Sequence, residues 1–255
     1  MNKVNCTKMI DLNGKTALIT GASHRIGAAI ARMLHGQGMN LVLHYRSSAA
    51  GAERLRDDLE DQRPNSVVLG QADLVHVMQL FELVELANNA FGRLDVLVNN
   101  ASSFYPTPVG EVTLKQWDDL MGSNLKGPFF LSQAAAPMLK AHGGCIVNLV
   151  DVHAERPKKE YPVYSMAKAG NAMMVKTLAR ELGPEVRVNG VAPGVILWPD
   201  EAMTEERKEE ILGRTVLERA GSEEDIARTV LFLVKDAEYI TGQIISVDGG
   251  RTVQQ

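Results

Sequence analysis

Short apolar runs alternate with longer amphipathic segments along almost the whole chain, and this alternation constrains the fold more than any other feature. Strands that alternate with crossover helices form parallel sheets. Seven runs are expected to be strands, at residues 15–20, 41–45, 66–73, 94–101, 145–150, 186–194 and 243–250. The sequence therefore predicts an α/β fold, a doubly wound parallel sheet of about seven strands with helices on both faces.

Apolar residues at helical spacing follow most of these strands. Helical stretches are expected at 113–139, 164–182, 204–212 and 222–234. Two further helices are expected to face the core with Ile26, Ile30, Met33 and Leu34 after the first strand, and with Val77, Leu80, Phe81 and Val84 after the third.

The chain of 255 residues contains no proline- or serine-rich linker, low-complexity tract or internal repeat. We therefore expect a single domain over residues 1–255, in which residues 1–12 are a tail leading into the first strand. The net charge of −4 comes from 27 basic and 31 acidic residues that are scattered along the chain. Because no basic stripe indicates nucleic acid or a membrane surface, a small molecule is the expected partner.

Only two cysteines occur, Cys6 and Cys145, too few for a disulfide framework or a tetrathiolate metal site. We expect a reducing, cytoplasmic compartment. The apolar stretch at 127–139 is shorter than the ~20 residues of a membrane helix, and the N-terminus lacks the apolar core of a secretion signal. We therefore expect no membrane partner and expect the mature chain to be the whole chain. The six histidines show no paired ligand spacing, so no metal site is expected.

The turn at residues 20–27 follows the first strand and opens a helix, the position at which a Rossmann-type sheet binds the phosphates of a dinucleotide. Gly21, Arg25 and Ile26 are its candidate cofactor-binding residues. An ordinary strand-to-helix turn is the alternative.

The end of the second strand indicates which dinucleotide would bind. A free adenosine ribose usually meets an acidic residue there, but residues 41–52 contain none and offer Tyr45, Arg46 and Ser47 instead. A guanidinium and hydroxyls suit a 2′-phosphate, which favours NADP(H) over NAD(H). Arg46 could otherwise be a solvated strand-end charge. Asp73 and Leu74 are candidates for holding the adenine, although Asp73 could equally cap the next helix.

Tyr164 and Lys168 stand four residues apart at the start of an expected helix, so they share one face. A neighbouring ammonium stabilises a phenolate, and we expect Lys168 to lower the pKa of Tyr164 from ~10 towards the range of a general acid or base. Such pairs are common on helix surfaces. A catalytic role is favoured here because the pair follows the fifth strand and Asn124 lies in the preceding helix.

At this point the chain resembles the short-chain dehydrogenase/reductase family over nearly its whole length. The resemblance rests on TGxxxRxG at 20–27, NNA at 99–101, YSMAK at 164–168 and PG at 193–194. It implies that Lys168 also binds the nicotinamide ribose and that Asn124 helps to hold a proton-relay water. It also implies that the cofactor-binding residues include Asn99, Ala101, Ser102, Tyr164, Lys168, Pro193 and Gly194.

Two departures from the family pattern are informative. Arg25 stands where most members have a glycine, and Asp151 stands where they have a catalytic serine, thirteen residues before the tyrosine. A serine hydroxyl polarises a carbonyl, whereas an aspartate can carry a proton to a ring nitrogen as hydride reduces a C=N bond. The change favours an imine-like heterocycle as substrate. Asp151 as a helix cap or surface acid is the alternative.

The runs at 63–66, 71–74 and 99–108, together with Asp151, Tyr161 and Tyr164, look specifically like the pteridine reductases. This resemblance implies that Phe104 stacks on the pterin and that Ser102 and Arg25 help to bind its edge. Tyr161 would contact the substrate, while Tyr164 and Asp151 would manage protons. Phe104 could instead be loop packing. The resemblance also implies a homotetramer, in which a neighbouring subunit's C-terminus can approach the site. The run at 247–255 departs from that pattern, because it has no arginine beyond Arg251.

The expected function is therefore that of an NADPH-dependent oxidoreductase, a pteridine reductase that reduces dihydrobiopterin or another dihydropterin, or dihydrofolate, to the tetrahydro form. One alternative is a short-chain carbonyl reductase acting on 3-ketoacyl thioesters, sugars or steroids, which a serine at 151 would have favoured. A second is a protein that senses NADP(H) without turnover; the Tyr164 and Lys168 pair argues against it because it predicts NADPH oxidation with some substrate.

Overall fold

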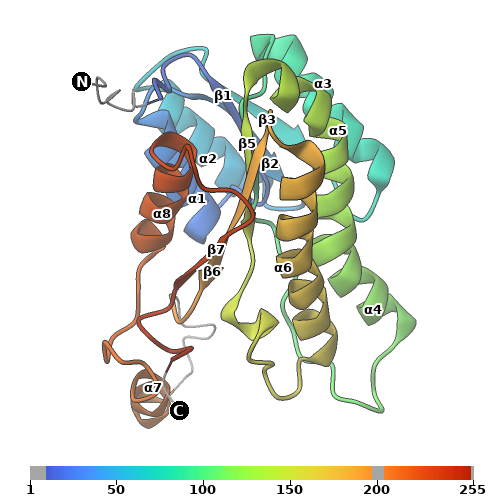
Figure 1. Ribbon diagram of the computed structural model, residues 1–255, viewed down its shortest axis with the longest axis vertical. Helices are drawn as coiled ribbons and strands as arrows, with labels where there is room; N and C mark the ends of the chain where they lie inside the picture. Colours follow the sequence, from blue (N-terminus) through green and yellow to red (C-terminus); the bar gives the residue numbers. More distant parts are fainter. Residues whose placement is uncertain (1–9, 197–203, 254–255) are drawn as a thin grey trace, which may run out of the picture.

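The computed structural model describes residues 10–196 and 204–253. The strands form one parallel sheet between two layers of helices (Figure 1). Its seven strands have the order β3-β2-β1-β4-β5-β6-β7. Their bounds are β1 Thr16–Ile19, β2 Asn40–Tyr45, β3 Val67–Gln71, β4 Val96–Asn99, β5 Cys145–Leu149, β6 Arg187–Pro193 and β7 Ile244–Val247. From β1 the chain adds β2 and β3 on one side and then β4 to β7 on the other side, so the sheet is doubly wound. The expected Rossmann-type α/β fold is confirmed.

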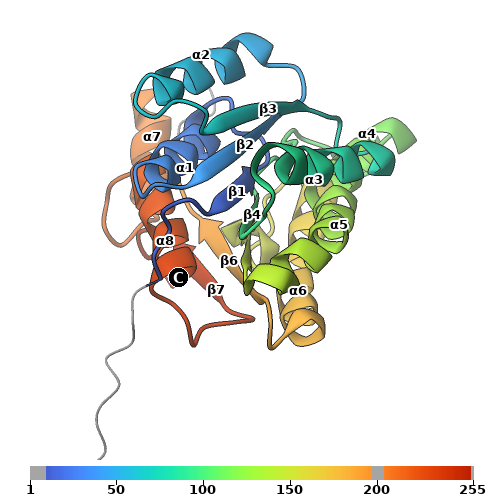
Figure 2. The same cartoon turned by 90° about the horizontal axis from the view of Figure 1, so that it is seen from above.

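The central strands carry continuous apolar runs because helices cover both of their faces. Every residue of β1, β4 and β5 is buried. On one face lie α1 (Arg25–His35), α2 (Ala49–Glu60) and α8 (Glu223–Lys235), and on the other lie α3 (Val77–Phe91), α5 (Gly127–His142) and α6 (Pro162–Leu182), as Figure 2 shows. Each face has its own buried apolar cluster, one built around Ile30, Leu34 and Val230, the other around Leu80, Leu131 and Ile146.

The helical segment expected at 113–139 is divided in three. It consists of α4 (Leu114–Met121), a π-helical turn η1 (Gly122–Lys126) and α5, so the backbone stays helical but changes pitch around Asn124. Thr113 starts α4 with a capping box that it forms with Gln116. Short elements complete the chain: η2 (Val152–Ala154) after β5, and α7 (Glu205–Leu212) before α8.

The structure differs from the expected helices in two places. Helix α2 was not expected, because only Ala52, Leu55 and Leu59 of its residues face the core and they give a weak apolar stripe. In α3 the buried stripe is Leu80, Leu83, Val84 and Ala87, whereas the side chain of Phe81 is 40% exposed. Residues 1–9 of the expected N-terminal tail lie outside the described residues, and residues 10–12 lead directly towards β1.

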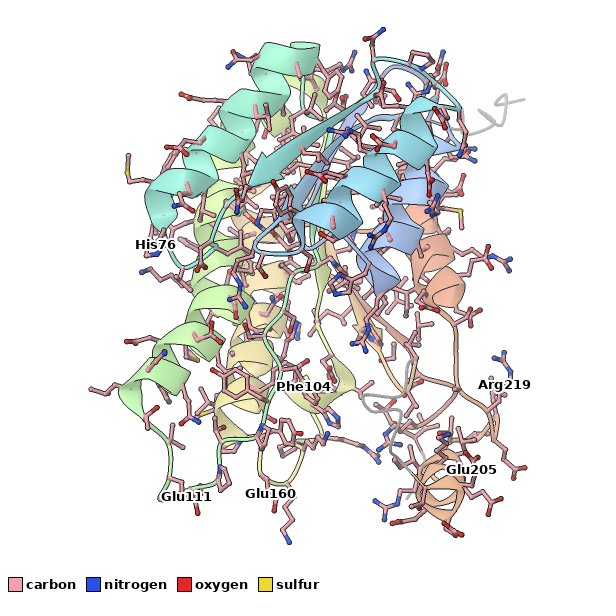
Figure 3. The ribbon with its side chains drawn as sticks, turned by 180° about the vertical axis from the view of Figure 1, so that it is seen from behind. His76, Phe104, Glu111, Glu160, Glu205 and Arg219 are labelled. Carbon is pink, nitrogen blue, oxygen red and sulfur yellow. The ribbon has the colours of Figure 1, made fainter. Side chains whose placement is uncertain are left out.

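The carboxyl ends of the parallel strands bring the loops after β1, β2, β4, β5 and β6 to one edge of the sheet. Phe104, which follows β4, and Glu160, which precedes α6, lie at the same end of the molecule (Figure 3). Within the described residues, no helix has both the length and the apolar character needed to cross a membrane.

Candidate functional site

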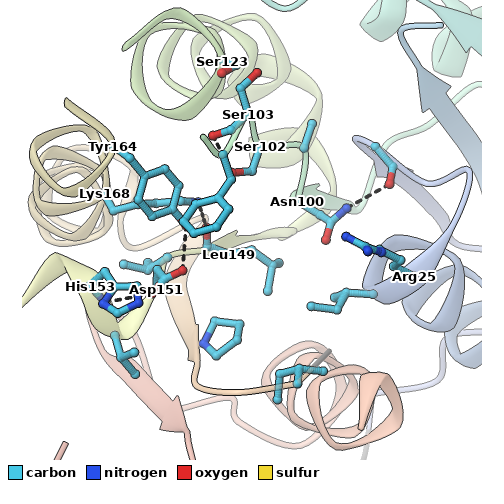
Figure 4. Close-up of a pocket in the computed structure, with 18 of the residues that line it drawn as sticks. Arg25, Asn100, Ser102, Ser103, Ser123, Leu149, Asp151, His153, Tyr164 and Lys168 are labelled. Carbon is cyan, nitrogen blue, oxygen red and sulfur yellow. Dashed lines mark hydrogen bonds between the residues drawn. The ribbon is translucent and has the colours of Figure 1, made fainter. Parts of the chain in front are cut away.

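A cavity of about 1550 Å³ opens at this edge of the sheet. Among its lining residues are nearly all the candidates from the sequence: Gly21, Arg25, Ile26, Tyr45, Arg46, Ser47, Asp73, Leu74, Ala101, Ser102, Phe104, Asp151, Tyr161, Tyr164, Lys168, Pro193 and Gly194. The Tyr164, Lys168 and Asp151 side chains lie on one side of it, and Arg25 and Asn100 lie on the other (Figure 4). The fold therefore gathers residues from the ends of six strands, β1 to β6, and from the start of α6 into one cleft.

The turn after β1 forms the floor of one end of the cavity. Gly21 has φ +62°, and a Cβ there would lie 2.9 Å from Ala101 Cα, so this position has room only for glycine. The side-chain amide of Asn100 donates to the carbonyl oxygens of Thr20 and Gly21, at 2.8 and 3.0 Å. The turn is thus fastened to the end of β4 and leaves the N-terminus of α1 open towards the cavity.

Arg25 occupies a backbone conformation that suits glycine. Its φ is +53°, in the left-handed region, which costs a residue with a Cβ about 1 kcal/mol. This explains why a glycine would be the ordinary choice in such a turn. The Arg25 side chain lines the cavity at the start of α1. The strained residue therefore places a positive charge in the cavity that a glycine could not supply.

At the end of β2, Tyr45, Arg46 and Ser47 line the adjoining part of the cavity. The Arg46 guanidinium forms an ion pair with Asp119 of α4, with 3.3 Å between Nη1 and Oδ1. Asp119 also accepts a hydrogen bond from the Tyr105 hydroxyl at 2.9 Å. Asp73 accepts a hydrogen bond from the backbone N–H of Val75, so its carboxylate orders its own loop while it lines the cavity.

The Tyr164 hydroxyl donates a hydrogen bond of 2.6 Å to the Asp151 carboxylate. The other carboxylate oxygen of Asp151 accepts from the backbone N–H of His153 and so caps the short helix η2. The alternative of Asp151 as a helix cap is therefore correct for one oxygen, while the other faces Tyr164. Lys168, which is buried, directs its ammonium to the Leu149 carbonyl oxygen at 2.8 Å.

The expected electrostatic effect of Lys168 on Tyr164 was wrong in this structure. Burial raises the pKa of Tyr164 well above its usual value, and the negative charge and hydrogen bond of Asp151 raise it further. Burial lowers the pKa of Lys168 to about 8, which the charge of Asp151 partly opposes. The carboxylate bonds the phenol directly, whereas the Lys168 ammonium is 5.7 Å from the Tyr164 ring centre. Tyr164 therefore keeps its proton at neutral pH, and its hydroxyl directs that proton to the Asp151 carboxylate.

Three aromatic rings meet beside this pair. The Phe104 ring stacks on Tyr161, with 4.7 Å between ring centres and 22° between planes, and it meets Tyr164 edge to face at 4.8 Å. The Phe104 side chain is 41% exposed and lines the cavity. It is therefore not buried loop packing, and it presents an aromatic surface next to the Tyr164 ring.

Two candidates do not reach the cavity. The Asn99 side chain is buried between Ser132 and Asn148, to which its amide donates, while its neighbour Asn100 lines the cavity instead. The side chain of Asn124 is buried in the π-helical turn: its oxygen accepts from Ser102 at 2.6 Å and its amide donates to the carbonyl oxygens of Ser103 and Leu120. Its side-chain polar atoms are thus engaged by the protein itself, and it acts on the site by holding Ser102.

Sequence reasoning missed His44, which is buried in β2. Its Nδ1 accepts the Gly21 backbone N–H and its Nε2 faces the Ala72 carbonyl oxygen, both at 3.0 Å. Since Nδ1 is an acceptor, the proton is on Nε2, which donates. One imidazole thus joins the turn after β1 to the loop after β3. A polar residue inside the apolar run at 41–45 was the signal that could have identified it.

Arg251 is the second residue that sequence reasoning did not place at the site. It lies in the turn after β7, yet it lines the same cavity as Asp151 and donates to the Ile211 carbonyl oxygen. The positive charge of Arg251 therefore reaches the cavity from the C-terminal segment of the same chain that carries Asp151.

Comparison with known proteins is consistent with this geometry. A family model of the short-chain dehydrogenase type, described as enoyl-(acyl carrier protein) reductase, matches residues 21–252. The chain belongs to the short-chain dehydrogenase/reductase family. It is thus an oxidoreductase, and members of this family generally use a nicotinamide dinucleotide.

Individual relatives within the short-chain dehydrogenase/reductase family have different names. Pteridine reductase 1 of Leishmania tarentolae is 37% identical over 274 residues, which cover 92% of this chain and 95% of the relative. A 3-oxoacyl-acyl-carrier-protein reductase of Staphylococcus aureus is 38% identical over 240 residues, covering 92% and 97%. Overall identity therefore does not separate these two substrate classes, and the residues of the cavity must do so.

Proposed function

We propose that the chain is an NADPH-dependent pteridine reductase that reduces a dihydropterin, such as dihydrobiopterin, or dihydrofolate to its tetrahydro form. The observation that carries the proposal is the 2.6 Å hydrogen bond between Tyr164 and Asp151 beside the aromatic surface of Phe104. A flat heteroaromatic ring fits against Phe104, and the Tyr164 and Asp151 pair offers its ring nitrogen a proton.

The cavity has the features that NADP(H) needs. Three features at the end of β1 suit a pyrophosphate: only glycine fits at position 21, the N-terminus of α1 is open, and Arg25 supplies a positive charge. Arg46 and Ser47, with no acidic residue between 41 and 52, suit a 2′-phosphate. NADP(H), when bound, supplies the hydride. Asp73 and Leu74 would adjoin the adenine, and Ala101, Ser102, Lys168, Pro193 and Gly194 would hold the nicotinamide half.

The residues of the chain account for the proton that accompanies the hydride. Tyr164 is protonated at neutral pH, as a phenol ordinarily is, and burial and Asp151 raise its pKa further above the usual value. It can therefore give up this proton only to a group that becomes more basic during the reaction, such as the nitrogen of a reduced C=N bond. Asp151 holds the Tyr164 hydroxyl in place, and Ser102, fixed by Asn124, lines the cavity beside it.

The decisive test is steady-state NADPH oxidation with dihydrobiopterin, dihydrofolate and a 3-ketoacyl thioester measured side by side. We expect turnover of the dihydropterin or the dihydrofolate. Tyr164→Phe and Asp151→Ser should each lower kcat for that substrate about 100-fold or more, with the Kd for NADPH little changed. Reduction of the thioester alone, or full activity of Tyr164→Phe, would show that the proposal is wrong.

A short-chain carbonyl reductase is the second candidate, favoured by the 38% identity to the 3-oxoacyl reductase. Asp151 argues against it, because a carboxylate cannot donate a hydrogen bond to a carbonyl oxygen as a serine hydroxyl can. A sensor that binds NADP(H) without turnover would leave the Tyr164 and Asp151 pair without a use.

Three further features are part of the proposal. The seven strands share one sheet, which supports a single domain. The low cysteine content supports a reducing, cytoplasmic compartment. We also expect a homotetramer, as the resemblance to the pteridine reductases implies.

A further inference from the structure

Basic side chains gather at the outer end of the cavity, beyond Tyr164 and Asp151. Two segments form this wall: the loop before α6, and the end of α7 together with the turn after β7. They contribute Arg156, Lys158, Lys159, Arg214 and Arg251, against the single carboxylate of Glu160. The chain as a whole has a net charge of −4, so this local excess among the described residues does not follow from composition.

Arg251 lies where a positive charge is costly. Burial lowers its pKa, and the neighbouring Arg214 guanidinium lowers it further, while Asp151 and Asp248 act in the opposite direction. Arg214 has its own partner, Glu210, at 2.5 Å, but both side chains of that pair are exposed and can rearrange at little cost. Two like charges in the wall of one cavity are stabilised when an anion binds between or beside them.

Lys158 extends the positive charge to the aromatic rings. Its ammonium lies 4.7 Å from the ring centre of Phe104 and 4.1 Å from that of Tyr161. The ammonium therefore lies over both rings, beside the place where a substrate ring would meet Phe104. Lys158, Arg214 and Arg251 line the same cavity, so a side chain that the ring carries towards the outer end meets positive charge there.

We propose that the outer end of the cavity is a subsite for an anionic side chain of the substrate. This inference rests on the proposed pteridine reductase function and specifies its substrate class: pterins that carry carboxylates, as the glutamyl group of dihydrofolate does, in preference to pterins with an uncharged side chain, as in dihydrobiopterin. Arg214 and Arg251 bind the carboxylates, and Lys158 lies at the passage between the ring and these two residues.

The test compares KM for dihydrofolate and dihydrobiopterin at saturating NADPH. Arg214→Gln and Arg251→Gln should each raise KM for dihydrofolate about fivefold, the factor expected when one exposed ion pair is lost. KM for dihydrobiopterin should change less than about twofold, because its side chain has no charge to lose a partner. Lys158→Met should act in the same direction, and Arg251→Lys, which keeps the charge, should restore most of the affinity for dihydrofolate.

A matched control is Lys140→Met, which removes an exposed cation from the last turn of α5, away from the cavity. It should leave both KM values unchanged. Salt provides a second readout: raising NaCl from about 20 to about 500 mM should raise KM for dihydrofolate and leave that for dihydrobiopterin nearly constant.

The outcomes separate the two claims. If both substrates are reduced but the charge variants and salt change their KM values by equal factors, the anionic subsite is refuted and the pteridine reductase function stands. If neither substrate is reduced, the proposed function is refuted and the subsite with it. Preference for dihydrobiopterin in the unaltered protein would also refute the subsite.

Discussion

At the scale of single residues, the side chain that most changes the chemistry of the site is Asp151. The spacing of Tyr164 and Lys168 was sufficient to predict that both line the cleft, and both do. It could not predict the direction of the Tyr164 pKa shift, because that depends on a carboxylate thirteen residues earlier and on burial. A helical spacing determines which side chains share a face, whereas electrostatics depend on what the fold places against that face.

His44 gives a prediction about pH. Burial lowers its pKa from 6.5 to about 4, opposed in part by its hydrogen bond to Ala72. The folded state therefore binds its proton less readily than the unfolded state, so this group has no effect on stability above pH 6.5 and destabilises the fold as pH falls from 6.5 to 4. The loss over this window is about 3 kcal/mol.

Urea unfolding at several pH values measures this loss. In His44→Gln, which keeps a donor for Ala72, the acid-dependent loss should be smaller than in the unaltered protein by about that amount, and NADPH should bind more weakly because Gly21 loses its acceptor. His142→Gln replaces an exposed histidine of α5 and serves as the control. An unchanged pH dependence in His44→Gln would contradict the assignment.

Asp119 gives a prediction about cofactor choice. Its carboxylate pairs with Arg46, the residue proposed to bind the 2′-phosphate, and so competes with that phosphate. Asp119→Asn should lower the Kd for NADPH about threefold and leave the Kd for NADH unchanged, as expected when one exposed ion pair no longer competes. Fluorescence titration measures both constants.

Asp118→Asn removes the same charge from the neighbouring, exposed position of α4 and is the matched control. Weaker NADPH binding in Asp119→Asn would reverse the interpretation, since it would mean that Asp119 orients Arg46 for the phosphate. Arg46→Ala should weaken NADPH binding and leave NADH binding nearly unchanged. Equal losses for both cofactors would remove Arg46 from the 2′-phosphate site.

At the scale of elements, strands were easier to predict than helices. Each of the seven expected strands exists, because a strand of a parallel sheet is a short apolar run, whereas the apolar stretch of α5 is much longer. Helix α2 was missed because its core-facing side is limited to three side chains. The Asn124 side chain, in the π-helical turn, bonds Ser102 and Ser103 of a distant loop, and a helical period does not reveal such contacts.

The start of α5 gives a prediction about packing. A Cβ on Gly127 would lie 2.7 Å from the Leu74 carbonyl oxygen and 2.9 Å from Leu74 Cβ. Gly127→Ala therefore has to move α5 away from the loop after β3, and it should destabilise the fold by about 1–3 kcal/mol. Since Leu74 lines the cavity, NADPH should also bind more weakly. Denaturant unfolding and a titration with NADPH measure these effects.

Gly36→Ala is the control, because a Cβ there meets only the Arg32 and Met33 carbonyl oxygens at 3.4 and 3.6 Å. It should change stability by less than about 1 kcal/mol. If Gly127→Ala were as stable as this control and bound NADPH normally, the contact between α5 and Leu74 would not constrain the cofactor end of the cavity.

At the scale of the whole molecule, the sequence predicted the α/β architecture and the meeting of the loops at the strand ends, but not that the segment after β7 joins them. Arg251 and Asp151 are separated by 100 positions, and the return of the chain through β7 brings both to one cavity. No periodicity or motif carries that information, because it depends on the path of the two segments between β6 and β7. The proposed anionic subsite could therefore be recognised only after the fold was known.

The surface formed by α5 and α6 gives the last prediction, which concerns assembly. Phe129, Met166 and Met173 are 39%, 48% and 57% exposed, and Phe129 and Met173 line an apolar groove of about 380 Å³ between these helices. Large apolar side chains gathered on one face favour association with another protein surface, and the expected homotetramer would cover them with a second copy.

Met173→Lys should then shift the chain towards smaller species in sedimentation velocity and lower Tm, because dissociation removes stabilisation by the partner subunit. Met78→Lys makes the same change at an exposed position of α3 that is outside the groove, and it should leave the mass unchanged. A monomeric chain at micromolar concentration, or an unchanged assembly in Met173→Lys, would exclude this face as the subunit contact.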